Sequence, residues 1–181
     1  MILVDTSAWV EYDRGTGSVV DQRLADLIAT DGPLAVTEPV LMEVMAGARD
    51  DRRESDLRRL LLRFDLLAFD SVVDFESAAR IHRQCRQVGV TPRGMVDCMI
   101  AAVARRTGAS LLAADVDLTR IAPVVGVELV SQPGTVDVSI RGIDVLRRRT
   151  LAGFSLTLNP SRDRGASGLR GSDKAPTCSF V

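Results

Sequence analysis

The chain has 181 residues, of which 46% are hydrophobic and 26% charged, and a formal net charge of −1. That length and apolar content suffice for one domain with a substantial core. No apolar run approaches the ~18 residues of a membrane span, and no basic segment precedes the short apolar start, so we expect a cytoplasmic protein without a membrane partner. The cysteines Cys85, Cys98 and Cys178 have no metal-ligand spacing, and we expect the first two in the core.

The charge is divided unevenly along the chain. Residues 136–181 carry seven arginines, Lys174 and four acidic groups, which leaves 15 basic and 20 acidic groups in residues 1–135. The composition changes near Ser131–Gly134, beyond which Pro, Ser, Gly and Arg dominate. This predicts a folded domain over residues 1–134 and a basic, disordered extension over 135–181. The composition of the extension fits both a native tail and a C-terminus read in an altered frame.

The first apolar run, residues 2–4, has no polar alternation, as expected of a strand that is buried on both faces. Asp5 ends this run, so its carboxylate should leave the sheet at the carboxyl end of the strand. Thr6 or Ser7 can cap the helix that follows. The apolar side of that helix is then formed by Ala8, Trp9, Val10 and Tyr12.

A second acid follows the next short strand, residues 34–36. Thr37 is an expected N-cap and Pro39 suits a first helical turn, which places Glu43 just beyond that turn. A helix that follows a parallel strand begins at the carboxyl edge of the sheet, so Glu43 should lie near Asp5. Glu38 competes with Glu43 as an acid of the first turn.

Two further acids belong to a helix and to the strand after it. Asp97 lies in the first turn of a helix that ends near Thr107, and Asp115 ends the strand predicted for residues 110–115. Helix and strand run antiparallel, so both acids should reach the same edge of the sheet. Asp117 lies two residues on, where it can share the role of Asp115 or cap the next helix.

The remaining segments predict more helices and strands in alternation. Strands are expected over residues 66–69 and 127–130. Alternation of this kind implies an α/β protein with a parallel sheet covered on both faces and with its ligand site at the carboxyl edge. Three apolar stripes with helical spacing are Val20, Leu24, Leu27 and Ile28; Leu57, Leu60, Leu61 and Phe64; and Ala78, Ile81, Cys85 and Val88.

Clustered carboxylates repel one another, so a fold that gathers them usually binds a cation. Hard oxygen ligands without a Cys/His set indicate Mg²⁺, with Mn²⁺ as the alternative. Each acid also has an ordinary structural role as a helix cap, a partner of the helix dipole or a solvated charge. We expect Asp5, Asp97, Asp115 and Asp117 to hold the metal.

Four segments of the chain together resemble the PIN-domain nucleases, specifically the VapC-type toxins of bacterial toxin–antitoxin pairs. These segments are Val4–Trp9, Glu38–Glu43, Arg93–Ala102 and Ala114–Leu118. The resemblance covers roughly residues 1–132. It implies a PIN-like three-layer fold with a five-stranded parallel sheet, a homodimer, RNA as substrate and inhibition by a VapB-type antitoxin. Leu118 stands where the family often has an aromatic residue, and the extension has no counterpart in the usual toxin.

The first hypothesis for function is a Mg²⁺- or Mn²⁺-dependent endoribonuclease that cleaves structured RNA of the tRNA or rRNA class. Its catalytic residues would be Asp5, Glu43, Asp97 and Asp115, and its candidate RNA contacts Thr6, Ser7 and Arg93. The second is a catalytically silent partner-binding module on the same fold, whose acids receive an arginine of the partner.

A third hypothesis, a phosphohydrolase or receiver-type domain, fits less well. A haloacid-dehalogenase-like site needs a second acid two residues after Asp5, where Ser7 stands. A receiver domain needs a late-strand lysine, and the sole lysine is Lys174 in the extension.

Overall fold

The computed structural model describes residues 1–130, which form an α/β domain with a parallel sheet in the order β3-β2-β1-β4. The predicted boundary at 131–134 and the predicted extension lie outside the described residues. The strands are β1 (Ile2–Val4), β2 (Leu34–Val36), β3 (Asp65–Leu66) and β4 (Ser110–Leu112). The helices are α1 (Thr6–Arg14), α2 (Val19–Ala29), α3 (Glu38–Ala46), α4 (Asp51–Leu61), α5 (Val73–Gln87), α6 (Met95–Thr107) and α7 (Val116–Val125). None of these helices is long and apolar enough to cross a bilayer.

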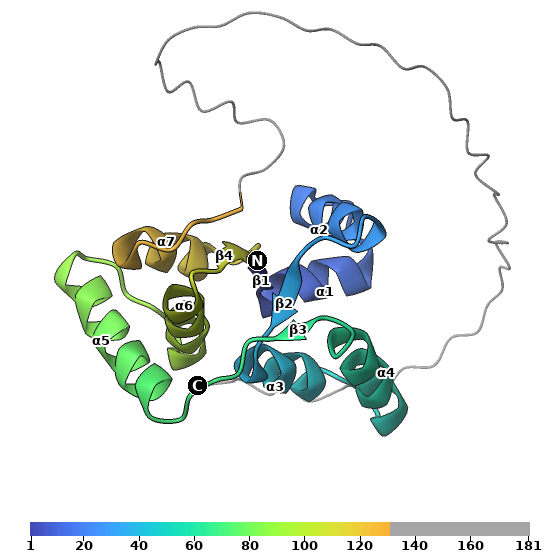
Figure 1. Ribbon diagram of the computed structural model, residues 1–181, viewed down its shortest axis with the longest axis horizontal. Helices are drawn as coiled ribbons and strands as arrows, with labels where there is room; N and C mark the ends of the chain where they lie inside the picture. The colour runs from blue at the N-terminus through green and yellow to red at the C-terminus, as the bar shows by residue number, and fades with distance from the viewer. Residues whose placement is uncertain (131–181) are drawn as a thin grey trace, which may run out of the picture. The chain divides into compact units, whose positions relative to one another are not determined.

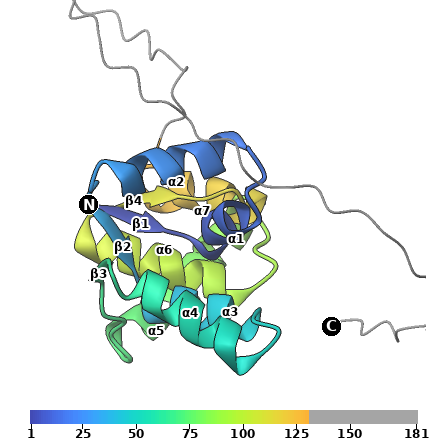
Figure 2. The same ribbon diagram turned by 90° about the vertical axis from the view of Figure 1, so that its right-hand side faces the viewer.

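The centre of the sheet is formed by β1, which pairs in parallel with β2 on one side and with β4 on the other. Leu3 is aligned with Ala35 and with Leu111, and all three are fully buried. Figure 2 shows the strands following one another as β4, β1, β2 and β3 from top to bottom. The continuous apolar composition of residues 2–4 thus reflects a strand with helices on both faces.

The prediction of five strands is wrong for the described residues, which contain four. Residues 127–130 reach the free edge of β4, but Leu129 makes only an isolated parallel bridge with Leu111. The Leu111 N–H donates to Glu128 O and the Val130 N–H donates to Leu111 O, both at 2.8 Å. One paired residue does not make a ladder, so this segment extends the sheet without forming a strand.

The strand predicted for residues 66–69 is also shorter, because it ends at Leu66. The Leu67 N–H still donates to Val36 O at 2.8 Å. The Phe69 N–H, however, donates to the Glu38 carboxylate at 2.7 Å. A side-chain acceptor from α3 therefore replaces the next acceptor of the ladder, and the chain leaves the sheet toward α5.

The helices lie on both sides of the strands. Figure 1 shows α5, α6 and α7 to the left of β1 and β4, with α1 and α2 to the right. The predicted apolar stripes face the core, where Leu24, Leu61 and Ile81 are buried. Val88 is an exception, because α5 ends at Gln87 and Val88 becomes its exposed C-cap.

Helix α6 is the most enclosed of these elements, and its position fixes the geometry of the site. Its buried residues are Cys98, Ile100, Ala101, Ala102, Val103 and Ala104. Gly108 ends the helix with φ +69°, a left-handed conformation that glycine adopts without strain, and the chain returns as β4. The start of α6 and the end of β4 consequently lie at the same edge of the sheet, as predicted.

A buried ion pair holds α5 against the other end of α6. Asp74, in the first turn of α5, is fully buried and accepts hydrogen bonds from Arg106 Nε at 2.9 Å and Arg106 Nη2 at 2.8 Å. Arg106 Nη2 also donates to Ala68 O, and the Asp70 N–H donates to Asp74. The start of α5 therefore lies beside the end of α6, so the two helices are antiparallel.

Replacing Asp74 by Asn should destabilise the domain strongly, because it leaves the half-buried Arg106 charge without its partner. We expect a loss of about 3 kcal/mol in the free energy of unfolding, measured by urea titration. Glu76→Gln is the matched control, since Glu76 is exposed and pairs with the exposed Arg80 at 2.6 Å. That change should cost less than about 1 kcal/mol. Equal losses in both variants would contradict the assigned role of the buried pair.

Candidate metal centre

Asp5 follows β1 directly and serves as the N-cap of α1. It is 3% exposed, and its Oδ2 accepts hydrogen bonds from the Ser7 N–H at 2.9 Å and from the Ser7 hydroxyl at 2.5 Å. The expectation that Thr6 or Ser7 caps this helix is wrong, because α1 begins at Thr6 and both residues lie in its first turn. Their side chains are instead free to act on the acids.

Ser7 joins the ends of two neighbouring strands. Its hydroxyl donates to Asp5 and accepts from the backbone N–H groups of Ala114 and Asp115 at 2.9 and 3.0 Å. The Ser7 hydroxyl thus donates its proton to one group of the protein and accepts hydrogen bonds from two others. Sequence reasoning missed this bridge, since it depends on β1 and β4 being neighbours in the sheet, which no local pattern indicates.

Glu43 is brought to Asp5 by a contact between α1 and α3. The Thr6 hydroxyl donates to Glu43 Oε2 at 2.6 Å. Glu38, the competing acid, is engaged elsewhere through its bond from Phe69. Thr37 is the N-cap of α3 as predicted, but its side chain makes no capping hydrogen bond. Of the two candidates, Glu43 is therefore the one beside the other acids.

Asp97, Asp115 and Asp117 form the tightest group of acids. One carboxylate oxygen from each lies within 4.8 Å of the others. Asp115 is the N-cap of α7 and accepts from the Asp117 N–H at 3.0 Å. Asp115, and not Asp117, is therefore the cap of this helix, and the carboxylates of both lie near that of Asp97.

Arg93 lies across the mouth of this group. Its Nε donates to Asp117 Oδ2 at 2.6 Å, and its Nη2 lies 3.3 Å from Asp115 Oδ1. The hydrogen bond from Arg93 lowers the pKa of Asp117 below its ordinary value. Although it makes these contacts, the Arg93 side chain is 74% exposed. The guanidinium can therefore leave the acids without disturbing the core.

The arrangement leaves negative charge without a counter-charge. Burial, followed by the charges of Asp5, Asp115, Glu43 and Asp117, raises the pKa of Asp97 to about 7. Burial also raises the pKa of Asp5, against the opposing effect of its bonds from Ser7. Asp97 makes no side-chain hydrogen bond within residues 1–130. The five predicted acids thus influence one another electrostatically at one place, the carboxyl edge of the sheet.

The acids fit a small divalent cation. Mg²⁺ binds oxygen ligands at about 2.0–2.1 Å, so two ligands on opposite sides of one ion lie about 4.2 Å apart. The 4.8 Å spread of Asp97, Asp115 and Asp117 is close to that separation. The donor atoms are all carboxylate oxygens, which suit Mg²⁺ or Mn²⁺ better than zinc.

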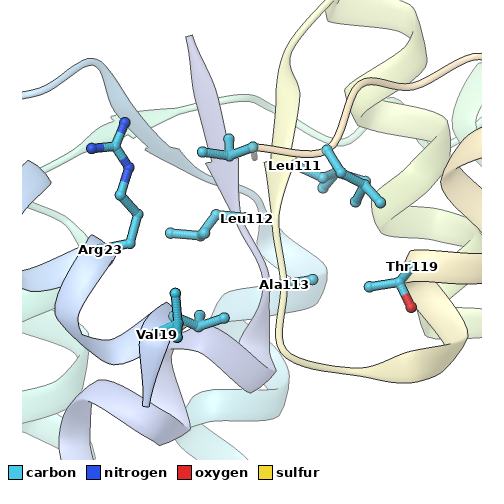
Figure 3. Close-up of a pocket in the computed structure, with 9 residues that line it drawn as sticks. Val19, Arg23, Leu111, Leu112, Ala113 and Thr119 are labelled. Atoms are coloured by element: carbon cyan, nitrogen blue, oxygen red, sulfur yellow. The ribbon is translucent and has the colours of Figure 1, made fainter. Parts of the chain in front are cut away.

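A cavity of about 200 Å³ lies beside β4 and differs in character from the acidic site. Figure 3 shows Leu112 of β4 extending toward Val19 and Arg23 of α2. The cavity is also lined by Leu111, Ala113 and Thr119. Its lining is mainly apolar and includes none of the five acids. The acidic site and this cavity are therefore separate features of the domain.

Comparison with known proteins agrees with this geometry. The family model for the PIN domain matches residues 2–123. Ribonuclease VapC11 from Mycobacterium tuberculosis is 41% identical over 132 residues, which cover 72% of this chain and 98% of the relative. VapC ribonuclease Mb1587 from Mycobacterium bovis matches with the same identity and coverage. The chain belongs to the PIN-domain family, in its VapC branch.

Solved structures support the PIN fold independently. VapBC2 from Rickettsia felis, solved bound to a promoter DNA fragment, aligns with a TM-score of 0.56 over 71% of this chain and 97% of that chain, at 19% identity. FitAcB from Neisseria gonorrhoeae also aligns with a TM-score of 0.56, over 75% of this chain and all of that chain, at 20% identity. At such identities the likeness concerns the fold alone.

Asp97→Asn should stabilise the metal-free protein at pH 8. The pKa of Asp97 is about 7 in the folded state against an ordinary 3.8, so ionisation of Asp97 removes stability as the pH rises from about 4 through 7. One pKa unit corresponds to about 1.4 kcal/mol, and because the side chain is only partly buried we expect a gain on the order of 1–2 kcal/mol.

The measurement is the unfolding midpoint in EDTA at pH 8 and at pH 5, where Asp97 already holds a proton and the gain should shrink. Asp26→Asn, at an exposed position of α2, is the control and should change neither midpoint. A destabilised Asp97→Asn protein at pH 8 would contradict the electrostatic account of the site.

Proposed function

We propose that this chain is a Mg²⁺- or Mn²⁺-dependent endoribonuclease and the toxin of a type II toxin–antitoxin pair, acting on structured RNA of the tRNA or rRNA class in the cytoplasm. The observation that carries this proposal is the gathering of five acids at one edge of the sheet, with carboxylate oxygens of Asp97, Asp115 and Asp117 within 4.8 Å of one another. Burial and the four neighbouring carboxylates together raise the pKa of Asp97. The 41% identical relatives are named ribonucleases, which supports the same activity here.

Asp5, Asp97, Asp115 and Asp117 would hold the cation. When bound, a divalent ion supplies positive charge to the scissile phosphate and lowers the pKa of a water molecule. Ser7 fixes Oδ2 of Asp5 by two hydrogen bonds, so the carboxylate keeps one orientation. Arg93 would exchange its contacts with Asp117 and Asp115 for the RNA phosphate, since an arginine binds carboxylate and phosphate with the same fork of donors.

Glu43 would accept a proton from the attacking water. Its Oε2 is occupied by the Thr6 hydroxyl, which leaves Oε1 as the acceptor. Thr6 and Ser7, two of the three candidate RNA contacts, therefore serve in this mechanism by orienting Glu43 and Asp5. Single-stranded loops of folded RNA are the accessible substrates for such a site, which is the reason for proposing structured RNA.

A VapB-type antitoxin is the proposed inhibitor, and a homodimer the proposed assembly. A groove of about 200 Å³ between α1, α3 and α4 includes Trp9, Val44 and Leu57 and reaches Glu43. The Trp9 Nε1 is buried without a hydrogen-bond partner within residues 1–130. An amphipathic segment of the antitoxin would place its apolar side chains in this groove and an arginine at the acids.

The alternative function is a catalytically silent partner-binding module. One observation favours it, namely that the guanidinium of Arg93 already binds Asp115 and Asp117. The same acids could receive a partner's arginine without ever holding a metal. Dependence of RNA cleavage on the metal separates the two functions.

Cleavage of a tRNA mixture should require Mg²⁺ or Mn²⁺ and should stop in EDTA. Asp97→Asn and Glu43→Gln should each lower the cleavage rate by at least about 100-fold, because one removes a metal ligand and the other the proton acceptor. The measurement is product formation on denaturing gels, with far-ultraviolet circular dichroism to confirm that each variant folds.

Asp26→Asn again serves as the control and should cleave at the rate of the unaltered protein. Undiminished cleavage in EDTA would overturn the metal-dependent mechanism. Folded protein that does not cut RNA with either metal would favour the silent module.

A further inference from the structure

A strongly cationic stretch of the chain leads into the acidic site. Residues 77–96 contain four arginines and no aspartate or glutamate, and the next residue is Asp97. Two of the four arginines are neutralised: Arg80 pairs with Glu76 at 2.6 Å, and Arg93 pairs with Asp117 at 2.6 Å. Arg83 and Arg86 form no ion pair within residues 1–130. The uncompensated charge of this stretch is thus confined to the last turns of α5.

Arg83 and Arg86 lie on one face of the helix. Their spacing of three residues places them side by side on α5, and both are exposed. Together with Gln87 they line a shallow, open hollow of about 300 Å³. Two guanidinium groups that share a hollow and have no acidic partner are suited to an anion with several oxygens.

The antiparallel packing of α5 on α6 places this hollow at the end of the domain that holds the acids. The Asp74–Arg106 pair joins the start of α5 to the end of α6. At the other end, α5 ends at Gln87, Gly89 follows its C-cap with φ +81°, and the chain reaches the start of α6 at Met95 six residues after Gly89. The last turn of α5 and the first turn of α6, which carries Asp97, are therefore neighbours.

We propose that Arg83 and Arg86 bind the RNA backbone a few nucleotides from the phosphate that is cut. Packed helices lie about 8–10 Å apart, or roughly three nucleotide rises of about 3.4 Å along one strand. Arg83 and Arg86 lie on the exposed face of α5, away from the buried Ile81 and Cys85, so their separation from the acids exceeds this spacing. When RNA enters the acidic site, the carboxylates repel the phosphates that flank the cleaved one. The positive charges of Arg83 and Arg86 offset that repulsion. The inference rests on the proposed function and adds a positioning surface to it.

The test is the salt dependence of RNA binding. A short fluorescein-labelled single-stranded RNA of mixed sequence is titrated by fluorescence anisotropy across a series of KCl concentrations in Mg²⁺. All proteins carry Asp97→Asn, so that the probe is not cut. Each phosphate contact on a single strand contributes about 0.7 to the slope of log K against log salt, so Arg83→Ala/Arg86→Ala should make the slope shallower by about 1.4.

Two variants serve as matched controls. Arg105→Ala removes an exposed arginine at the opposite end of the α5–α6 pair and should leave the slope unchanged. Arg83→Lys/Arg86→Lys keeps the charge and should retain the slope. If the double alanine variant does not fold, the single charge-reversal variants Arg83→Glu and Arg86→Glu replace it. Each should also make the slope of log K against log salt shallower.

The outcomes separate this inference from the proposed function. One outcome is that the unaltered protein cuts RNA with Mg²⁺ but the salt slope of Arg83→Ala/Arg86→Ala equals that of Arg105→Ala. This result overturns the inference alone and indicates that the two arginines bind an acidic protein partner. A shifted slope supports the inference. A shifted slope in a protein that cuts no RNA with Mg²⁺ or Mn²⁺ supports the binding surface and overturns the proposed activity.

Discussion

The arrangement of the site depends on the hydrogen bonds of the Ser7 hydroxyl group. It donates to the Asp5 carboxylate and accepts from the backbone of Ala114 and Asp115, so one side chain joins the ends of β1 and β4. The backbone already joins these segments through the hydrogen bond from the Asp5 N–H to Leu112 O at 2.9 Å, and Ser7 adds the link from the Asp5 carboxylate to the start of α7. Thr6, the residue before it, holds Glu43 in the same way. Two adjacent hydroxyl groups in the first turn of α1 therefore bond the carboxylates of Asp5 and Glu43, and one of them also accepts from the backbone of Asp115.

Placing several carboxylates together is electrostatically unfavourable, and this repulsion contributes to the pKa values of the acids. Burial and neighbouring carboxylates raise the pKa of Asp97, while Arg93 lowers the pKa of Asp117 at the rim. Arg93 partly neutralises the Asp115 and Asp117 side of the cluster, whereas Asp97 makes no side-chain hydrogen bond within residues 1–130. Asp74 is fully buried and accepts two hydrogen bonds from Arg106, so it stabilises the fold. The two acids thus differ in that Asp74 has a cationic partner and Asp97 has none.

Sequence patterns predicted the placement of the acids at one edge of the sheet, because each acid follows a strand or lies near the start of a helix. Asp5, Glu43, Asp97 and Asp115 could be assigned to one sheet edge from chain order and parallel topology alone. The patterns failed where a tertiary contact replaces a local one. Glu38 takes the Phe69 N–H and shortens β3, and Leu129 reaches β4 through a single bridge, so neither predicted strand extends as far as its apolar residues indicate. The Ser7 bridge joins residues more than a hundred positions apart, a contact that no periodicity reports.

The most direct test of the central claim is the affinity of the protein for Mn²⁺, measured by electron paramagnetic resonance of the free ion. If Ser7 organises the acids into a metal centre, Ser7→Ala should weaken Mn²⁺ binding by about 10- to 100-fold, although all five carboxylates remain. Thr16→Ala, which removes an exposed hydroxyl bonded to Glu11, should leave the affinity unchanged. Equal Mn²⁺ affinity in folded Ser7→Ala and in the unaltered protein would contradict the account.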